Sequence, residues 1–245
     1  AEFRRYRHND LSHLEHLLQK AQKSAYSRIW VVSETLFSMG GDRADTSKIA
    51  ALCEAYNALF YSDDAHAIGV FGENGLGLNP GIDGVHLSIG TFGKSFGAFG
   101  AFVACSLDIQ QYLINFSPGF IYTTALPPAV IGAVSAALKL IPEMEDERKR
   151  LLEKAGQVRK ELHSLGFDTG SSQSQIIPVM IGSEKETMQL SDDLLQAGIL
   201  AVAVRPPTVE QGKSRIRLTI SSLHTDAEIS QLLSVFKSHA HASSG

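Results

Sequence analysis

One lysine of the sequence stands among residues that could turn its amine into a nucleophile. Lys94 lies in the run 91–97, with glycines on both sides of it and with Phe92, Phe96 and Phe99 nearby. A lysine amine must lose its proton before it attacks an aldehyde, and an apolar setting lowers its pKa. We therefore expect the phenylalanines to desolvate Lys94, which would then carry pyridoxal phosphate (PLP) as a Schiff base.

Two other interpretations of this run must be weighed. A lysine between glycines is also typical of a tight turn in which the amine stays solvated and charged. A nucleotide-binding P-loop would need a glycine at position 88, where the sequence has Ser88. The stretch 72–77 has the spacing G-x-x-G-x-G, which is not a dinucleotide fingerprint, and it is predicted to be a loop.

Asp63 and His66 form the second group that could do chemistry. The short apolar run 58–62 follows a helical pattern over 46–57 and ends at Asp63, as buried parallel strands often do. A carboxylate there could pair with a protonated pyridine nitrogen, and His66 could bond the ring hydroxyl or move a proton. A turn with a capping aspartate is the alternative, and the combination with Lys94 argues against it.

Together with other segments of the chain, these residues resemble the α-oxoamine synthases. Members of this family are fold-type I PLP enzymes that condense an amino acid with an acyl-CoA and release carbon dioxide. The resemblance rests on ordered blocks along nearly the whole chain. These blocks are 7–14, 33–42, 63–66, 91–97, 122–128, 205–209 and 215–219. Within the family, the R-P-P-T-V block at 205–209 is most similar to members that join a pimeloyl thioester to L-alanine. A sibling synthase that uses glycine or serine remains an alternative.

The resemblance implies a role for each matching residue near the cofactor. Lys94 would form the Schiff base and then remove the α-proton of the amino acid. Asp63 would face the pyridine nitrogen, while His66 and Ser38 would hold the ring hydroxyl. The hydroxyl of Thr91 would contact the cofactor phosphate.

The resemblance also implies residues for the substrate and the partner subunit. Thr124 would reach the phosphate in a neighbouring subunit, so a homodimer with a shared active site is expected. Arg217 would bind the carboxylate of the amino acid through both oxygens. Thr208 would line the acyl or carboxylate side, and Glu34 matches an acidic position near the substrate that could equally be structural.

Helical and strand patterns alternate along the chain, which indicates an α/β organisation. We expect a partial PLP-binding large domain with a mainly parallel sheet over 1–140, and a C-terminal α+β small domain over 141–245. The expected helices are 10–24, 46–57, 127–140, 143–165, 185–197 and 225–238. The expected strands are 29–32, 58–62, 85–89, 100–105, 176–181, 199–204 and 214–220.

Composition narrows the class of protein further. The chain is 44% hydrophobic and 20% charged, with a net charge of -4, no apolar run long enough to span a bilayer and only two cysteines, Cys53 and Cys105. We expect both cysteines to be buried, no metal site, no nucleic-acid or membrane partner, and a cytoplasmic location. The resemblance implies that the substrates are L-alanine and either an acyl-CoA or an acyl group carried by acyl carrier protein.

Length is where the sequence departs from the family. The chain corresponds to the later part of a typical member, so we expect an N-terminal segment to be missing. By analogy that segment would carry a phosphate loop, the ring that stacks on the pyridine and part of the acyl-CoA site. A fragment without catalytic activity that serves only in assembly is therefore a further alternative.

Overall fold

The computed structural model describes residues 2–242, which form two compact units. The first unit comprises Ala1–Leu36 and Ala44–Glu145, and the second comprises Phe37–Arg43 and Asp146–Gly245. The short segment Phe37–Arg43 thus belongs with the later part of the chain, although it begins only three residues after the first strand ends. The domain boundary expected at residue 140 stays a prediction.

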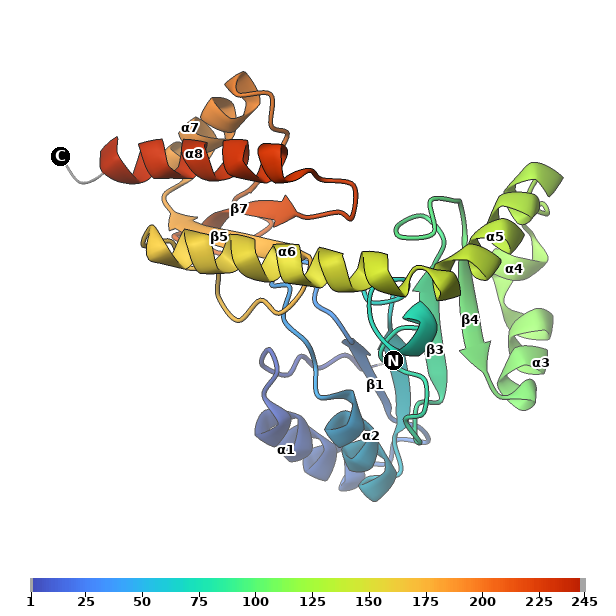
Figure 1. The fold of residues 1–245 in the computed structure, drawn as a ribbon. Helices are drawn as coiled ribbons and strands as arrows, with labels where there is room; N and C mark the ends of the chain where they lie inside the picture. Colours follow the sequence, from blue (N-terminus) through green and yellow to red (C-terminus); the bar gives the residue numbers. More distant parts are fainter. Residues whose placement is uncertain (1, 243–245) are drawn as a thin grey trace. The chain divides into compact units, whose positions relative to one another are not determined.

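A four-stranded sheet forms the centre of the first unit (Figure 1). Strands β1 (Trp30–Glu34), β2 (Leu59–Asp63) and β3 (Leu87–Thr91) run parallel, and β4 (Ala101–Cys105) pairs antiparallel with β3. The order along the sheet is the order in the sequence. The expected mainly parallel sheet is confirmed.

Helices α1 (Leu11–Gln22) and α2 (Thr46–Ala55) pack against β1 and β2. Each begins at an aspartate whose side chain accepts a hydrogen bond from a backbone N–H of the first turn, which satisfies one of the free donors there. The core that they share contains Leu14, Leu18, Val31, Ile49, Ala50, Cys53, Ala58 and Phe60. Cys53 is fully buried, as expected.

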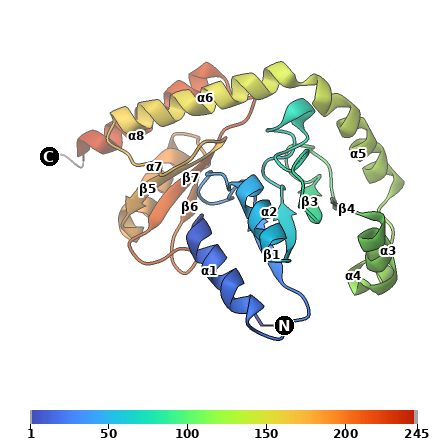
Figure 2. The same cartoon turned by 90° about the horizontal axis from the view of Figure 1, so that it is seen from below.

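The far edge of this sheet is exposed. Helices α3 (Leu107–Phe116), α4 (Pro118–Ile121) and α5 (Pro128–Leu140) follow β4 and contain no buried residue, although their sequences are largely apolar (Figure 2). Helices α3 and α4 were absent from the sequence-based expectation. Cys105, at the end of β4, is only half-buried, so the expectation of a buried thiol is wrong there.

The second unit has its own three-stranded antiparallel sheet in the order β5 (Ile176–Gly182), β7 (Ser214–Thr219), β6 (Val202–Val204). Helices α6 (Glu145–Ser164), α7 (Glu184–Gln196) and α8 (Asp226–Ala242) complete it. Helix α6 buries Leu151, Ala155, Val158 and Leu162, whose spacing places them on one face. This is the expected α+β unit.

Two short 3₁₀ turns complete the described chain, η1 (Glu73–Gly75) and η2 (Ile141–Glu143). The first lies in the stretch 72–77 that was predicted to be a loop. Within residues 2–242, no helix is both long and apolar enough to cross a bilayer.

Candidate active site

The parallel strands bring their last residues to one edge of the first unit's sheet. In the register, Glu34 of β1 is paired with Asp63 of β2, and Asp63 is paired with Ile89 of β3. Strand β3 ends two residues later at Thr91, and Lys94 follows in the next turn. The edge where α/β folds collect functional groups therefore carries Glu34, Asp63 and the lysine loop.

Asp63 begins the turn that carries His66. Its Oδ1 accepts a hydrogen bond of 2.9 Å from the backbone N–H of Ala65, and its carbonyl accepts one of 2.8 Å from Thr35. Both Asp63 and His66 are half-buried. The turn thus holds the carboxylate of Asp63 and the imidazole of His66 at the end of β2.

Asp64, for which no role was predicted, follows Asp63 and points into the unit. Its side chain is 3% exposed and accepts hydrogen bonds from the hydroxyl of Thr35 and, at 2.9 Å, from the N–H of Leu78. Burial raises the pKa of this carboxyl, while the hydrogen bonds oppose the shift. A side chain at Gly77 would collide with Asp64, since its Cβ would lie 1.9 Å from Oδ2. Asp64 therefore ties the ends of β1 and β2 to the loop before β3.

The strand period could have shown that Asp64 points inward. Side chains alternate between the two faces of a strand, so Asp64 shares a face with Phe60 and Ser62, both fully buried. Ser62 belongs to the same buried layer. Its hydroxyl donates to Asn79 Oδ1 at 2.8 Å, and Asn79 Nδ2 donates to the hydroxyl of Ser88 at 2.7 Å.

The lysine loop is closed by its own backbone and by Thr91. The Thr91 hydroxyl donates to the carbonyl of Gly100 at 3.1 Å and accepts from the N–H of Gly93 at 3.2 Å. The N–H of Gly97 donates to the carbonyl of Lys94 at 3.0 Å, so residues 94–97 form a turn. The Thr91 hydroxyl thus shapes the loop, and its contact with a phosphate stays a prediction.

The expectation that phenylalanines desolvate Lys94 is wrong for this chain, because Lys94 is exposed. Phe96 is buried, but its ring packs edge-on against Phe92, with 5.4 Å between ring centroids. The ring of Phe92 also contacts Phe102, and Phe99 is 65% exposed. The aromatic rings therefore build the core beneath the loop and leave the lysine outside it.

A second group of predicted residues lies within the second unit. Arg217 of β7 is half-buried and donates from Nε to the backbone carbonyl of Ser38 at 2.7 Å. Burial lowers the pKa of its guanidinium. Thr208 is exposed in a turn, where its N–H donates to the carbonyl of Arg205 at 3.0 Å.

The predicted residues are thus divided between the units. Ser38 lies in the second unit with Arg217, whereas His66, with which it was expected to share the ring hydroxyl, lies in the first. Thr124 also lies in the first unit and is exposed between α4 and α5. The roles of all these residues stay predictions.

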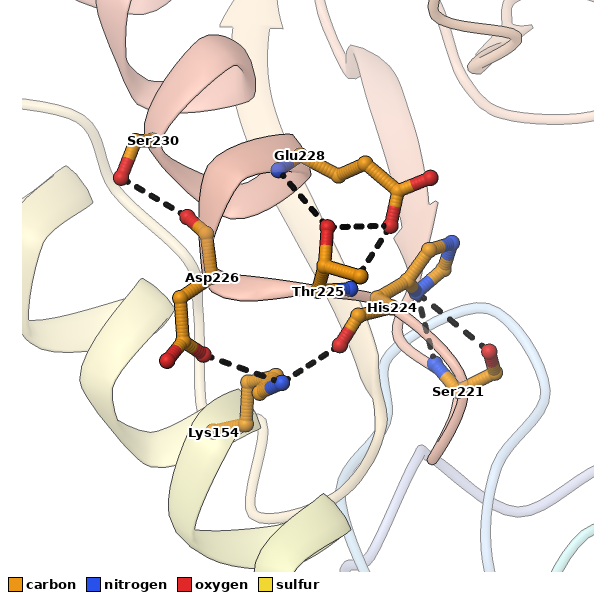
Figure 3. Close-up of polar contacts among 7 residues, drawn as sticks. All are labelled: Lys154, Ser221, His224, Thr225, Asp226, Glu228 and Ser230. Atoms are coloured by element: carbon orange, nitrogen blue, oxygen red, sulfur yellow. Dashed lines mark hydrogen bonds and ion pairs between the residues drawn. The ribbon is translucent and has the colours of Figure 1, made fainter.

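A shallow cavity of about 340 Å³ in the second unit lies between α6 and the turn before α8. Lys154 of α6 donates to the carbonyl of His224 at 2.5 Å and pairs with Asp226 at 3.2 Å (Figure 3). Beside it, Thr225 and Glu228 exchange hydrogen bonds as a capping box that starts α8. These contacts pair the polar groups of Lys154, Thr225 and Glu228 with nearby partners, so they indicate a structural link between α6 and the start of α8.

Metal chemistry has no candidate in the described part of the chain. Over residues 2–242, no three side chains of histidine, cysteine, aspartate or glutamate are gathered where they could hold an ion.

Comparison with known proteins places the chain among related sequences. A model of the family "Aminotransferase class I and II" matches residues 1–236. A protein of Paramagnetospirillum magneticum, named provisionally as an 8-amino-7-oxononanoate synthase, is 50% identical over 229 residues. The match covers 94% of this chain and 58% of that relative, so the chain spans little more than half of its length.

Solved structures share the fold. A structure of SPT (serine palmitoyltransferase) with a PLP internal aldimine has a TM-score of 0.92 and 28% identity, covering 99% of this chain and 62% of that one. A structure of 8-amino-7-oxononanoate synthase from Francisella tularensis has a TM-score of 0.83 and 26% identity, covering 100% and 70%. The two units therefore have the fold of fold-type I PLP-dependent transferases, and the chain belongs to the aminotransferase class I and II family.

Proposed function

We propose that this chain forms part of a PLP-dependent α-oxoamine synthase. The enzyme would condense L-alanine with a pimeloyl thioester to give 8-amino-7-oxononanoate, a step of biotin synthesis, with release of carbon dioxide and of the free thiol. The observation that carries the proposal is the meeting of Asp63 and the Lys94 loop at the carboxyl edge of the parallel sheet. A family relative and a solved structure that bear the name of this activity support it.

PLP, when bound, supplies an aldehyde for an amine and a ring that withdraws electrons from the reacting carbon. Asp63 would hold a proton on the ring nitrogen, because an adjacent carboxylate favours the charged form of its partner. His66, in the same turn, would hold the ring hydroxyl. Lys94 would bind the cofactor and accept the α-proton of the amino acid, and Thr91 would stand near the phosphate.

Arg217 and Thr208 would serve the substrate. The described hydrogen bond of Arg217 uses Nε, so its two terminal nitrogens can bind both oxygens of a carboxylate. The bond to the Ser38 carbonyl orients the planar guanidinium and thereby orients the amino acid. Thr208, exposed beside the R-P-P-T-V block, would line the acyl or carboxylate side.

A sibling synthase that uses serine is the second candidate, and one observation favours it. The serine palmitoyltransferase structure has the higher TM-score, 0.92 against 0.83. A sibling synthase that uses glycine is distinguished by the same comparison of amino acids. The R-P-P-T-V block and the 50% identical relative favour alanine, and neither distinguishes acyl-CoA from acyl carrier protein as the thioester donor.

The proposal includes a cytoplasmic homodimer with a shared active site and no nucleic-acid or membrane partner. Thr124 is exposed on the segment that precedes α5, where a neighbouring subunit could use it. The exposed apolar helices α3 to α5 would also suit a fragment that acts only in assembly, which is the alternative without catalysis. Light scattering of the purified chain separates a dimer from a monomer.

The function is tested by loading the purified chain with PLP and recording its visible absorption. Borohydride reduction followed by peptide mapping should place the adduct on Lys94. Lys94→Ala should lose the adduct, whereas Lys139→Ala, which removes an exposed lysine of α5, should keep it. Addition of L-alanine, glycine or L-serine to separate unreduced samples should change the spectrum most for alanine.

Three results would contradict the proposal. A reduced adduct spread over several lysines would mean that Lys94 has no special reactivity. A larger response to serine than to alanine would assign the chain to the sibling synthase. A chain that takes up no PLP and remains monomeric would favour the fragment that acts in assembly.

A further inference from the structure

Ser95, next to the predicted Schiff-base lysine, contacts the turn that carries His66. Its hydroxyl donates to the carbonyl of Ile68 at 2.6 Å. The backbone after Ile68 lies against this serine, since a Cβ at Gly69 would stand 2.3 Å from Ser95 Oγ and 2.6 Å from its Cβ. Only a glycine at position 69 allows this close approach.

The carbonyl that receives this bond is itself held in place. The N–H of Ile68 donates to the carbonyl of Asp64 at 2.9 Å, and the Ile68 side chain is 6% exposed. Ile68 packs with Phe96 and Ile141 in one buried cluster. Asp64 in turn is fixed by its bonds at the ends of the strands. The hydroxyl of Ser95 therefore attaches the lysine loop to a rigid point.

Two backbone groups close the lysine loop on itself. Lys94 is exposed, so burial does not fix its place, and the bonds from Gly93 and Gly97 join the loop only to itself. Phe96 anchors one end of the loop in the core. The bond of Ser95 and the packing of Phe96 on Ile68 both join the loop to the turn of Asp63 and His66, and the bond of Ser95 lies directly beside the lysine.

We propose that Ser95 is a positioning residue for Lys94: its hydroxyl holds the lysine loop against residues 64–68, so that Lys94 and Asp63 can serve one cofactor. This rests on the function proposed above for Lys94 and Asp63. The hydroxyl itself need not touch the cofactor or the substrate. Its effect is on where the amine stands relative to the carboxylate and imidazole.

The test compares Ser95→Ala with the wild-type chain, first without cofactor. Amide hydrogen exchange over residues 93–97 should be about two- to tenfold faster in the variant, as expected for the loss of one hydrogen bond. Competitive acylation followed by mass spectrometry should show a changed pH dependence of labelling at Lys94, with labelling at Lys139 unchanged. Ser24→Ala, which removes an exposed hydroxyl that bonds a local carbonyl, should change neither.

The loaded chain provides the second readout. With PLP bound, Ser95→Ala should shift the pH at which the absorption band changes and raise the PLP dissociation constant about two- to tenfold. Ser95→Thr keeps the hydroxyl and should restore both. The fluorescence of Trp30 in the first unit reports whether each variant is folded, and if Ser95→Ala does not fold, Ser95→Cys, a weaker donor, should give the same changes.

The outcomes separate this inference from the proposed function. If the wild-type chain takes up no PLP, the proposed function fails, while exchange and acylation still decide whether Ser95 positions the lysine. If Ser95→Ala exchanges like wild type, the bond does not hold the loop and the inference is overturned. If amide hydrogen exchange is faster in Ser95→Ala but the pH dependence of acylation at Lys94 is unchanged, Ser95 has only a structural role. The inference is then overturned as well.

Discussion

Replacement of Asp64 should separate its charge from its hydrogen bonds. The side chain is 3% exposed and accepts from the Thr35 hydroxyl and the Leu78 N–H. Asp64→Ala leaves both donors buried without this acceptor, and each orphaned group costs about 1–3 kcal/mol. Removal of a desolvated carboxylate offsets part of that loss, so we expect a net destabilisation of about 2–4 kcal/mol.

Asp64→Asn has nearly the same shape and should behave differently. Its Oδ1 can still accept from Leu78, and its Nδ2 can donate to the Thr35 hydroxyl, which is able to accept as well as donate. We therefore expect the stability of Asp64→Asn to be within about 1 kcal/mol of wild type at low pH. The contrast between alanine and asparagine measures the hydrogen bonds.

Wild type and Asp64→Asn together test how the buried charge of Asp64 affects stability. Burial raises the pKa of Asp64 above its ordinary value of 3.8, so the folded protein binds more protons than the unfolded chain between the two pKa values. The contribution of this group is fully present below pH 3.8 and is lost as the pH rises through the folded-state pKa. Asp64→Asn has no such loss, and it should gain stability relative to wild type as the pH is raised.

The assay is urea unfolding followed by the fluorescence of Trp30, the single tryptophan. Trp30 lies in β1, paired with Leu59 of β2, so it reports on the first unit alone. Unfolding is measured at several pH values from 3.5 to 7 for the three proteins, where effects of the other carboxylates cancel in the differences. A difference between wild type and Asp64→Asn that stays constant with pH would refute the reasoning about the buried charge.

Three further predictions concern other parts of the chain. In the folded protein, a thiol reagent should label Cys105 and leave Cys53 unlabelled until the chain unfolds. The reason is that Cys53 is buried, and burial raises the pKa of its thiol to about 12. Fast labelling of Cys53 would contradict its position in the core. Lys154→Met should destabilise the second unit by about 1–3 kcal/mol in thermal unfolding followed by circular dichroism, since the His224 carbonyl loses a charged donor, and the Trp30 transition should not move. The isolated chain should bind a hydrophobic dye through the apolar surface of α3 to α5. Phe116→Ser removes a ring that is 66% exposed and should reduce the fluorescence of the bound dye. An unchanged fluorescence would mean that the dye binds elsewhere.

Much of the fold could be predicted from local patterns. The alternation of helical and strand patterns indicated a mainly parallel sheet followed by an α+β unit, and both are present. Such patterns work because burial of one face imposes a period on the sequence. Helices α3 and α4 were missed, although α3 is amphipathic, and in the structure neither buries a residue.

The candidate site shows where local patterns stop. The residue types around Lys94 and Asp63 indicated PLP chemistry from the sequence. The phenylalanines near Lys94 were predicted to desolvate the lysine, whereas Phe92 and Phe96 pack in the core. Phe92 and Phe96 pack with Ile68, which is distant in sequence, and no local pattern reveals which side of a loop faces the core.

The sequence by itself indicated the family, most of the elements and their order, and it predicted which residues could react. The tertiary structure alone decided that Asp63 stands beside Glu34, that Asp64 binds Thr35 and Leu78, and that Ser95 reaches Ile68. The physical reason is that these contacts join segments about ten to thirty residues apart. Their partners are selected by strand register and by the packing of the whole unit, which adjacent residues do not encode.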